Sequence, residues 1–176
     1  GEKNFLLDFD AIEAAITPRT KLLIFNDLHN PTGAESPDEE REALAELARK
    51  HDLYVLSDEA YWDIRYSGAS KSIASLPGMQ ERTVILYTFS KKFAMTGWRL
   101  GGAIGPKELI AVIATMNVNQ ESCTCHFIQW AGVEALNGDQ SGAKQILATL
   151  RERRDAAVRG LNAIDGVSCY SPEATF

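Results

Sequence analysis

Residues 22–58 read LLIFNDLHNPTGAESPDEEREALAELARKHDLYVLSD and alternate between strand-like and helix-like patterns. Two short apolar runs, 22–25 and 53–56, have the length and composition of buried strands. Between them, Ser36 followed by proline and acidic residues predicts the start of a helix, which we expect to end near Lys50. Strand, helix and strand in this order are typical of an α/β domain with a mostly parallel sheet.

The rest of the chain continues this alternation and then becomes helical. Residues 83–88 and 100–104 have the patterns of further strands. Before the first strand, a helix is expected to start at Asp10, with Asp8 as the alternative. The remaining expected elements are helices at about residues 107–117, 123–136 and 140–161, and a final strand near 167–170.

The change from alternating strands to consecutive helices suggests how the chain is divided. We expect residues 1–137 to form part of a large domain, 138–162 a long connecting helix, and 163–176 the start of a smaller C-terminal domain. The sequence begins at Gly1 rather than at a methionine, and it stops soon after the last expected strand. We therefore expect the chain to be the central segment of a longer protein.

The composition argues against several classes of protein. Apolar residues make up 45% of the 176 residues and charged residues 24%, which is too apolar for a disordered chain. The formal net charge of −6 argues against a protein that binds nucleic acid through its phosphates. No apolar run approaches the ~20 residues of a membrane-spanning helix. We expect a cytoplasmic protein with neither nucleic acid nor a membrane as its partner.

The cysteines do not form a metal-binding pattern. Cys123, Cys125 and Cys169 contain no Cys-x-x-Cys pair, and no pair of histidines lies nearby at the spacing of a zinc site. We therefore expect no metal. Because Cys123 and Cys125 fall in a stretch that resembles a helix, we expect them to be small buried thiols.

Polar clusters follow three of the predicted strands. They are residues 29–33, residues 57–61, and Ser90-Lys91 with residues 97–99 beyond them. In open α/β sheets, ligands bind at the carboxyl ends of the strands. The three clusters are therefore expected to meet in one crevice and to share one ligand.

These clusters resemble the class I and II aminotransferase family, which depends on pyridoxal 5′-phosphate and includes aspartate aminotransferase-like enzymes. The resemblance lies in Asn-Pro-Thr-Gly at 30–33, Asp-Glu-Ala-Tyr at 58–61, and Ser90-Lys91 followed eight residues later by Arg99 in Gly-x-Arg-x-Gly. Their order and spacing match the family over most of the chain. The resemblance implies a three-layer α/β/α fold with a mostly parallel sheet, here present in part.

The resemblance assigns the central chemistry to two residues. Lys91 would form a Schiff base with pyridoxal 5′-phosphate and would then act as the base that moves the substrate α-proton. Asp58 would pair with the pyridine nitrogen and keep it protonated, so that the ring can accept electrons. Lys92 is the rival of Lys91, but the family pattern places the role on the lysine directly after serine.

The resemblance gives the other matching residues roles in holding the cofactor. Arg99 would grip the phosphate, because a planar fork of donors suits a phosphate group, and Ser90 and Thr88 would add hydroxyl donors. Asn30 and Tyr61 would donate hydrogen bonds to the phenolic oxygen of the ring. These bonds would stabilise the negative form of that oxygen and lower the proton affinity of the adjacent imine.

Each of these residues also has an ordinary structural explanation. The segment Asn30-Pro31-Thr32-Gly33 is a good turn, whose Asn-Pro bond can be cis. Asp58 could cap a helix, Tyr61 could be a core residue, and the lysines and Arg99 could lie on the surface. One shared binding site explains all the positions together, and we therefore prefer it.

The resemblance implies transfer of an amino group between an amino acid and a 2-oxo acid, in a homodimer. A lyase or decarboxylase of the same fold is the first alternative, because the bond that breaks depends on how the substrate is oriented. The cofactor-binding module of a transcriptional regulator is the second. Features that we cannot locate in these 176 residues are the family's glycine-containing phosphate-binding helix start, its ring-stacking aromatic residue and its substrate-carboxylate arginine.

Overall fold

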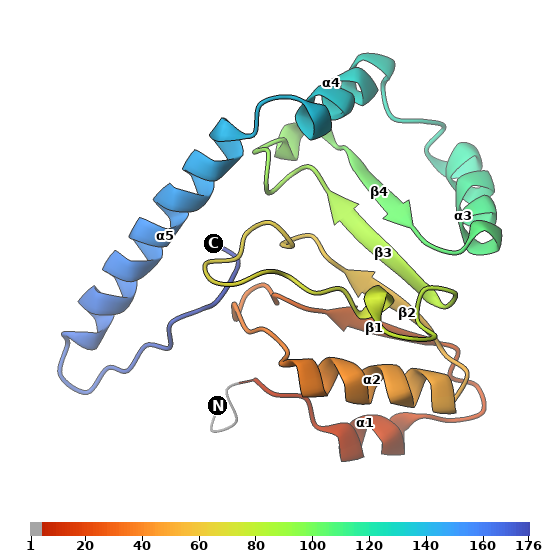
Figure 1. Cartoon of the computed structure of the whole chain (residues 1–176), viewed down its shortest axis with the longest axis horizontal. Helices are drawn as coiled ribbons and strands as arrows, with labels where there is room; N and C mark the ends of the chain where they lie inside the picture. Colours follow the sequence, from red (N-terminus) through yellow and green to blue (C-terminus); the bar gives the residue numbers. More distant parts are fainter. Residues whose placement is uncertain (1–4) are drawn as a thin grey trace.

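The computed structural model describes residues 5–176, and it shows helices and strands in alternation, followed by helices alone (Figure 1). The first four residues of the predicted large-domain segment 1–137 lie outside the described range. The elements are α1 (Phe9–Ala15), β1 (Leu22–Asn26), α2 (Asp38–Lys50), β2 (Tyr54–Asp58), the 3₁₀ turn η1 (Ile73–Ser75), β3 (Thr83–Thr88), the 3₁₀ turn η2 (Thr96–Trp98), β4 (Gly101–Ile104), α3 (Lys107–Gln120), α4 (His126–Asn137) and α5 (Ser141–Asn162).

The four strands form one sheet in the order β1-β2-β3-β4. β1 pairs with β2 and β2 with β3 in parallel, whereas β4 runs antiparallel to β3 at the edge. The prediction of an α/β fold with a mostly parallel sheet is therefore confirmed. Because the first three strands are parallel, their carboxyl ends meet at one edge of the sheet.

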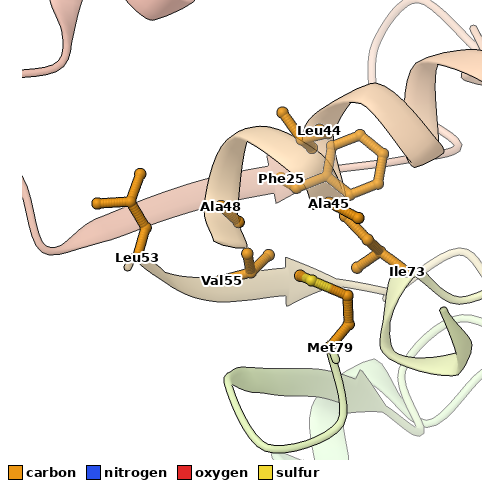
Figure 2. Close-up of a cluster of buried hydrophobic side chains, with 8 residues drawn as sticks. All are labelled: Phe25, Leu44, Ala45, Ala48, Leu53, Val55, Ile73 and Met79. Atoms are coloured by element: carbon orange, nitrogen blue, oxygen red, sulfur yellow. The ribbon is translucent and has the colours of Figure 1, made fainter. Parts of the chain in front are cut away.

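The main core lies between one face of the sheet and α2 (Figure 2). The α2 helix contributes one apolar face, as its sequence pattern predicts, and β1 and β2 contribute the side chains that point toward it. η1 and the loop after it close the cluster, and Phe9 of α1 packs against it. The buried members are Phe25, Leu44, Ala45, Ala48, Leu53, Val55, Ile73 and Met79.

The opposite face of the sheet presents apolar side chains to solvent. Side chains alternate between the two faces of a strand, so Leu22 and Ile24 of β1 point away from Phe25, and both are exposed. α3 and α4 lie on the β4 side of the picture, away from α1 and α2 (Figure 1). In α4, Gly132 is buried, and a Cβ atom there would lie 2.7 Å from Cδ2 of Leu100.

The helix starts differ slightly from the sequence-based expectation. Asp8 rather than Asp10 caps α1, and its carboxylate accepts a hydrogen bond from the backbone N–H of Ala11. α2 begins at Asp38 with Pro37 at the cap position, one residue later than a helix capped by Ser36 would begin. The Ser36 N–H instead binds a side chain of the preceding loop.

The chain returns to the sheet domain after α5 (Figure 1). The final segment, residues 171–176, runs beside the loops that follow the strands. Backbone hydrogen bonds join Glu173 to Tyr66 and Thr175 to Ile64, at 2.9 and 3.0 Å. The guanidinium of Arg154 on α5 lies over the Tyr66 ring and donates to the Pro172 carbonyl. Residues 64–66, Arg154 and residues 172–175, which are far apart in the sequence, thus pack against one another.

Two expectations for the second half of the chain are wrong. The strand predicted near 167–170 does not form, because the Asn162 side chain binds both the N–H and the C=O of Cys169 and occupies groups that a strand would pair. Cys123 and Cys125 precede α4 rather than lying within it, and both are exposed.

Among the helices described over residues 5–176, none is long and apolar enough to cross a membrane.

Thr83, at the start of β3, carries a buried hydroxyl group whose effect on stability can be tested. Its side chain is 1% exposed, and within the described residues its hydroxyl has no hydrogen-bond partner. Because a buried hydroxyl without a partner costs free energy, we expect Thr83→Val to raise the free energy of unfolding by about 1 kcal/mol. Denaturant unfolding of the full-length gene product measures this change. The exposed Thr115, whose hydroxyl donates to the Ala111 carbonyl, is the control, and an equal gain from Thr115→Val would contradict the explanation.

Candidate cofactor site

The polar residues predicted for the site gather at the carboxyl edge of the sheet. Asp58 is the last residue of β2, directly opposite Asn26 at the end of β1, and the Asn26 amide donates to its carboxylate at 3.4 Å. The other carboxylate oxygen of Asp58 accepts from the Ala60 N–H at 3.1 Å. Thr88 ends β3, and its hydroxyl accepts from the Ser90 N–H at 3.1 Å. Asp58 is half-buried.

Residues 27–36, here called the Asn30 loop, lie between β1 and α2. The side-chain amide of Asn30 donates to the hydroxyl of Tyr61 at 2.7 Å, and the Asn30-Pro31 bond is cis. Gly33 has φ of +67°, and a side chain there would overlap Pro172. This position therefore requires glycine, which lets the final segment of the chain lie against the loop.

The two neighbouring lysines have different surroundings. The Lys92 ammonium lies 3.1 Å from a carboxylate oxygen of Asp63 and forms an ion pair. The Lys91 ammonium instead lies 5.3 Å from the centre of the Tyr61 ring and 5.1 Å from that of Phe176. Among the described residues, Lys91 has no ion-pair partner.

The residues predicted to bind phosphate share the connection between β3 and β4. Ser90 is buried, and its carbonyl accepts from the hydroxyl of Thr96 at 3.2 Å. The Thr96 carbonyl in turn accepts from the guanidinium of Arg99 at 3.1 Å. Arg99 adopts the left-handed conformation and is exposed, which leaves most of its donors free. Thr96 therefore links Ser90 to Arg99, a role that sequence reasoning did not assign.

The structure thus joins the predicted residues in two groups. Direct contacts bring Asn30, Tyr61 and Lys91 together, and the sheet register places Asp58 at the same edge. Thr88, Ser90 and Arg99 form the second group, which is connected to the first because Ser90 precedes Lys91 in the chain. Sequence reasoning missed Phe176, whose ring contacts Tyr61 with centroids 5.5 Å apart. A single phenylalanine outside any motif does not indicate in the sequence that its ring lies beside Tyr61 and Lys91.

Glu59 is a buried carboxyl group next to Asp58 that sequence reasoning left without a role. Its Oε1 accepts hydrogen bonds from the hydroxyls of Ser57, at 3.1 Å, and Ser72, at 2.5 Å. Burial raises the pKa of Glu59 above its usual value, and the two serine hydroxyls offset part of this effect.

Tyr87 on β3 also has a raised pKa. Burial and the adjacent Asp63 carboxylate, to which its hydroxyl donates a hydrogen bond, are the causes.

The raised pKa of Glu59 predicts a pH dependence of stability. Between the usual pKa of the carboxyl and its raised value, the folded protein holds a proton that the unfolded chain has lost. The free energy of unfolding therefore falls as pH rises through this window, starting near pH 4.5. We expect Glu59→Gln, which keeps the acceptor oxygen, to be more stable than wild type at pH 8. Denaturant unfolding between pH 4 and 8 tests this, and an equal slope in both proteins would contradict it.

Comparison with known proteins agrees with this geometry. The model of the family described as aminotransferase class I and II matches residues 1–176. An aspartate aminotransferase from Musicola paradisiaca is 40% identical over 173 residues, covering 98% of this chain and 43% of that protein. An aspartate aminotransferase from Rhizobium meliloti is 42% identical over 176 residues, with coverages of 98% and 43%. The chain belongs to the class I and II aminotransferase family.

A solved structure supports the same assignment at the level of the fold. The aspartate aminotransferase from Rhizobium meliloti superimposes with a TM-score of 0.93 at 39% identity, over 100% of this chain and 45% of that chain. The chain therefore spans less than half the length of the relatives that it matches. The shared part includes the sheet, the Asn30 loop and the β3–β4 connection.

Proposed function

We propose that the protein containing this chain transfers an amino group between an amino acid and a 2-oxo acid, with pyridoxal 5′-phosphate held covalently on Lys91. The observation that carries the proposal is the location of the Lys91 side-chain nitrogen and its lack of an ion pair. It lies beside Tyr61 at the ligand-binding edge of the sheet and has no ion-pair partner among residues 5–176, whereas Lys92 is paired with Asp63. Membership of the aminotransferase family supports the same reaction.

The donors and acceptors at this edge fit such a cofactor. An amine suits an aldehyde, a carboxylate suits a protonated pyridine nitrogen, and hydroxyls with a guanidinium suit a phosphate. Lys91, Asp58, and the group of Thr88, Ser90 and Arg99 supply these functions in turn. The exposed Arg99 favours this use, because among residues 5–176 its side chain makes one hydrogen bond, to the Thr96 carbonyl.

In the proposed reaction, Lys91 acts as both anchor and base. When bound, the cofactor supplies an electron sink that makes the α-proton of an amino acid acidic. Nζ of Lys91, once released by the incoming amine, takes that proton and carries it across the site. Nζ lies over the faces of the Tyr61 and Phe176 rings, 5.3 and 5.1 Å from their centres.

The remaining residues would hold the ring in place. Asp58, oriented by Asn26 and by the Ala60 N–H, keeps a proton on the pyridine nitrogen. Asn30 and Tyr61, which form a hydrogen-bonded pair, would donate to the phenolic oxygen. The predicted domain division at 137 and 162, the homodimer and the cytoplasmic location stay predictions.

Borohydride trapping tests the proposal. The full-length gene product is mixed with pyridoxal 5′-phosphate, its visible spectrum is recorded, and it is then reduced with borohydride and digested for mass spectrometry. We expect the reduced cofactor on Lys91 in wild type and in Lys92→Ala, and none at this site in Lys91→Ala. Label on Lys92, or no specific label, would refute the assignment.

A further inference from the structure

A buried ion pair holds the base of the Asn30 loop. The guanidinium of Arg41, on the first turns of α2, donates to Asp27 Oδ2 at 2.8 Å and to Asp38 Oδ1 at 2.7 Å. The Arg41 side chain is 6% exposed and that of Asp27 is 12% exposed. Glu35 Oε1 lies 3.7 Å from the same guanidinium. A charge buried to this degree is rare unless partners compensate it.

The other oxygen of Asp27 closes the loop on itself. Oδ1 accepts from the N–H of Leu28 at 2.8 Å and from the N–H of Ser36 at 2.9 Å, so that it joins the two ends of the loop. Within the loop, the His29 N–H donates to the Ala34 carbonyl at 2.9 Å. Asp27 therefore connects the closed loop to Arg41.

Arg41 is itself fixed by the core. It belongs to α2, whose residues Leu44, Ala45 and Ala48 are packed in the main apolar cluster. Burial alone would lower the pKa of Arg41, but the hydrogen bonds and charges of Asp38 and Asp27 outweigh it and hold that pKa above its usual value. The guanidinium thus stays charged whenever the protein is folded.

We infer that the Asp27–Arg41 pair is a clamp that positions Asn30 for its hydrogen bond at the cofactor. The inference rests on the proposed function for the role of Asn30. The path is short: α2 holds Arg41, Arg41 holds Asp27, Asp27 closes the loop, and the loop carries Asn30 to the Tyr61 hydroxyl, 2.7 Å away. Asp27 and Arg41 are positioning residues, because neither contacts the reacting groups.

The first arm of the test needs no cofactor. Amide hydrogen exchange of residues 28–34 is compared in the full-length gene product and its Arg41→Gln variant. We expect exchange in the loop to become faster by about tenfold or more, because the clamp limits local opening. Lys50→Gln is the matched control: Lys50 lies on the same helix and pairs with Glu13, away from the loop. Unchanged exchange in Arg41→Gln would overturn the inference.

The second arm reads the position of Asn30 at the cofactor. Asn30 is proposed to lower the proton affinity of the group that joins Lys91 to the cofactor, so losing its hydrogen bond raises the pH midpoint of the visible absorption change. We expect Arg41→Gln and Asn30→Ala each to raise this midpoint, by up to about one pH unit, and Lys50→Gln to leave it unchanged. Faster exchange in Arg41→Gln without a shifted midpoint would overturn the inference.

Two further variants separate positioning from general damage. Arg41→Lys keeps the charge but loses the planar fork, so we expect a folded protein with an intermediate midpoint. In Arg41→Gln combined with Asn30→Ala, we expect a shift smaller than the sum of the two, because both changes remove the same hydrogen bond. Additive shifts would count against the clamp. If wild type shows no cofactor absorption, the proposed function fails, and the exchange arm alone decides whether the clamp holds the loop.

Discussion

Replacing Lys91 with alanine is expected to lower the rate of amino-group transfer by about four orders of magnitude. Removing a base costs about 10²- to 10⁴-fold, and here the same side chain is also the covalent anchor. The geometry supports a specific effect, because Lys91 Nζ lies over the Tyr61 and Phe176 rings and is not used in an ion pair of the described chain. Turnover of the full-length gene product with a panel of amino acids and 2-oxo acids measures the loss.

The neighbouring lysine provides the control. Lys92→Ala removes the same number of atoms one position away and breaks the ion pair with Asp63 and the contact of the ammonium with the Phe93 ring. We expect its turnover to stay within about tenfold of wild type. Added methylamine is expected to restore part of the activity of Lys91→Ala, since a small amine can replace the missing base. Equal losses in the two variants would show that the region matters for folding rather than for reaction at Nζ.

Replacing Asp58 with asparagine is expected to lower turnover by about 10³-fold. Asparagine keeps the oxygen that accepts from the Ala60 N–H, at 3.1 Å, so the local turn is preserved. It removes the negative charge that the proposal places beside the pyridine nitrogen. Losing one charged group that acts on the reacting centre typically costs 10²- to 10³-fold. Turnover and the cofactor dissociation constant, measured on the same samples, separate chemistry from binding.

The other end of the same strand supplies a matched variant. Asp52 precedes β2 at its amino end, is 94% exposed in its side chain and pairs with Arg82 at 3.1 Å. It has a positive φ of 51°, which asparagine tolerates. We therefore expect Asp52→Asn to fold and to react like wild type. A large loss of turnover in Asp52→Asn would mean that acidic residues around β2 act through stability, and the role proposed for Asp58 would fall.

Much of the sheet could be predicted because local patterns specify it. β3 lies at the predicted residues 83–88, and β1, β2 and β4 differ from the predicted runs by one or two residues at their ends. The final strand could not be predicted correctly, because the apolar run near 167–170 looks the same whether or not a partner strand is present. The deciding contact comes from the Asn162 side chain, which no periodicity reveals.

The candidate site could be predicted as a set of residues but not as a set of contacts. Asp58 ends a strand, Asn30 and Lys91 follow strands, and parallel pairing brings strand ends together. The clamp could not be found in this way, because Asp27 and Arg41 are 14 positions apart, and their meeting depends on how α2 packs on the sheet.

The return of residues 171–176 to the sheet sets an order for folding. The Tyr66 hydroxyl donates to the Thr175 carbonyl across 109 positions, and Arg151 reaches the Tyr66 carbonyl across 85. Contacts of such long sequence separation form late, because the intervening chain must first be ordered. On the ribosome, Lys91 and Asp58 leave the exit tunnel well before Phe176 does. The strands and α2 can therefore assemble first. Phe176 can contact Lys91 and Tyr61 only after α5 has been synthesised.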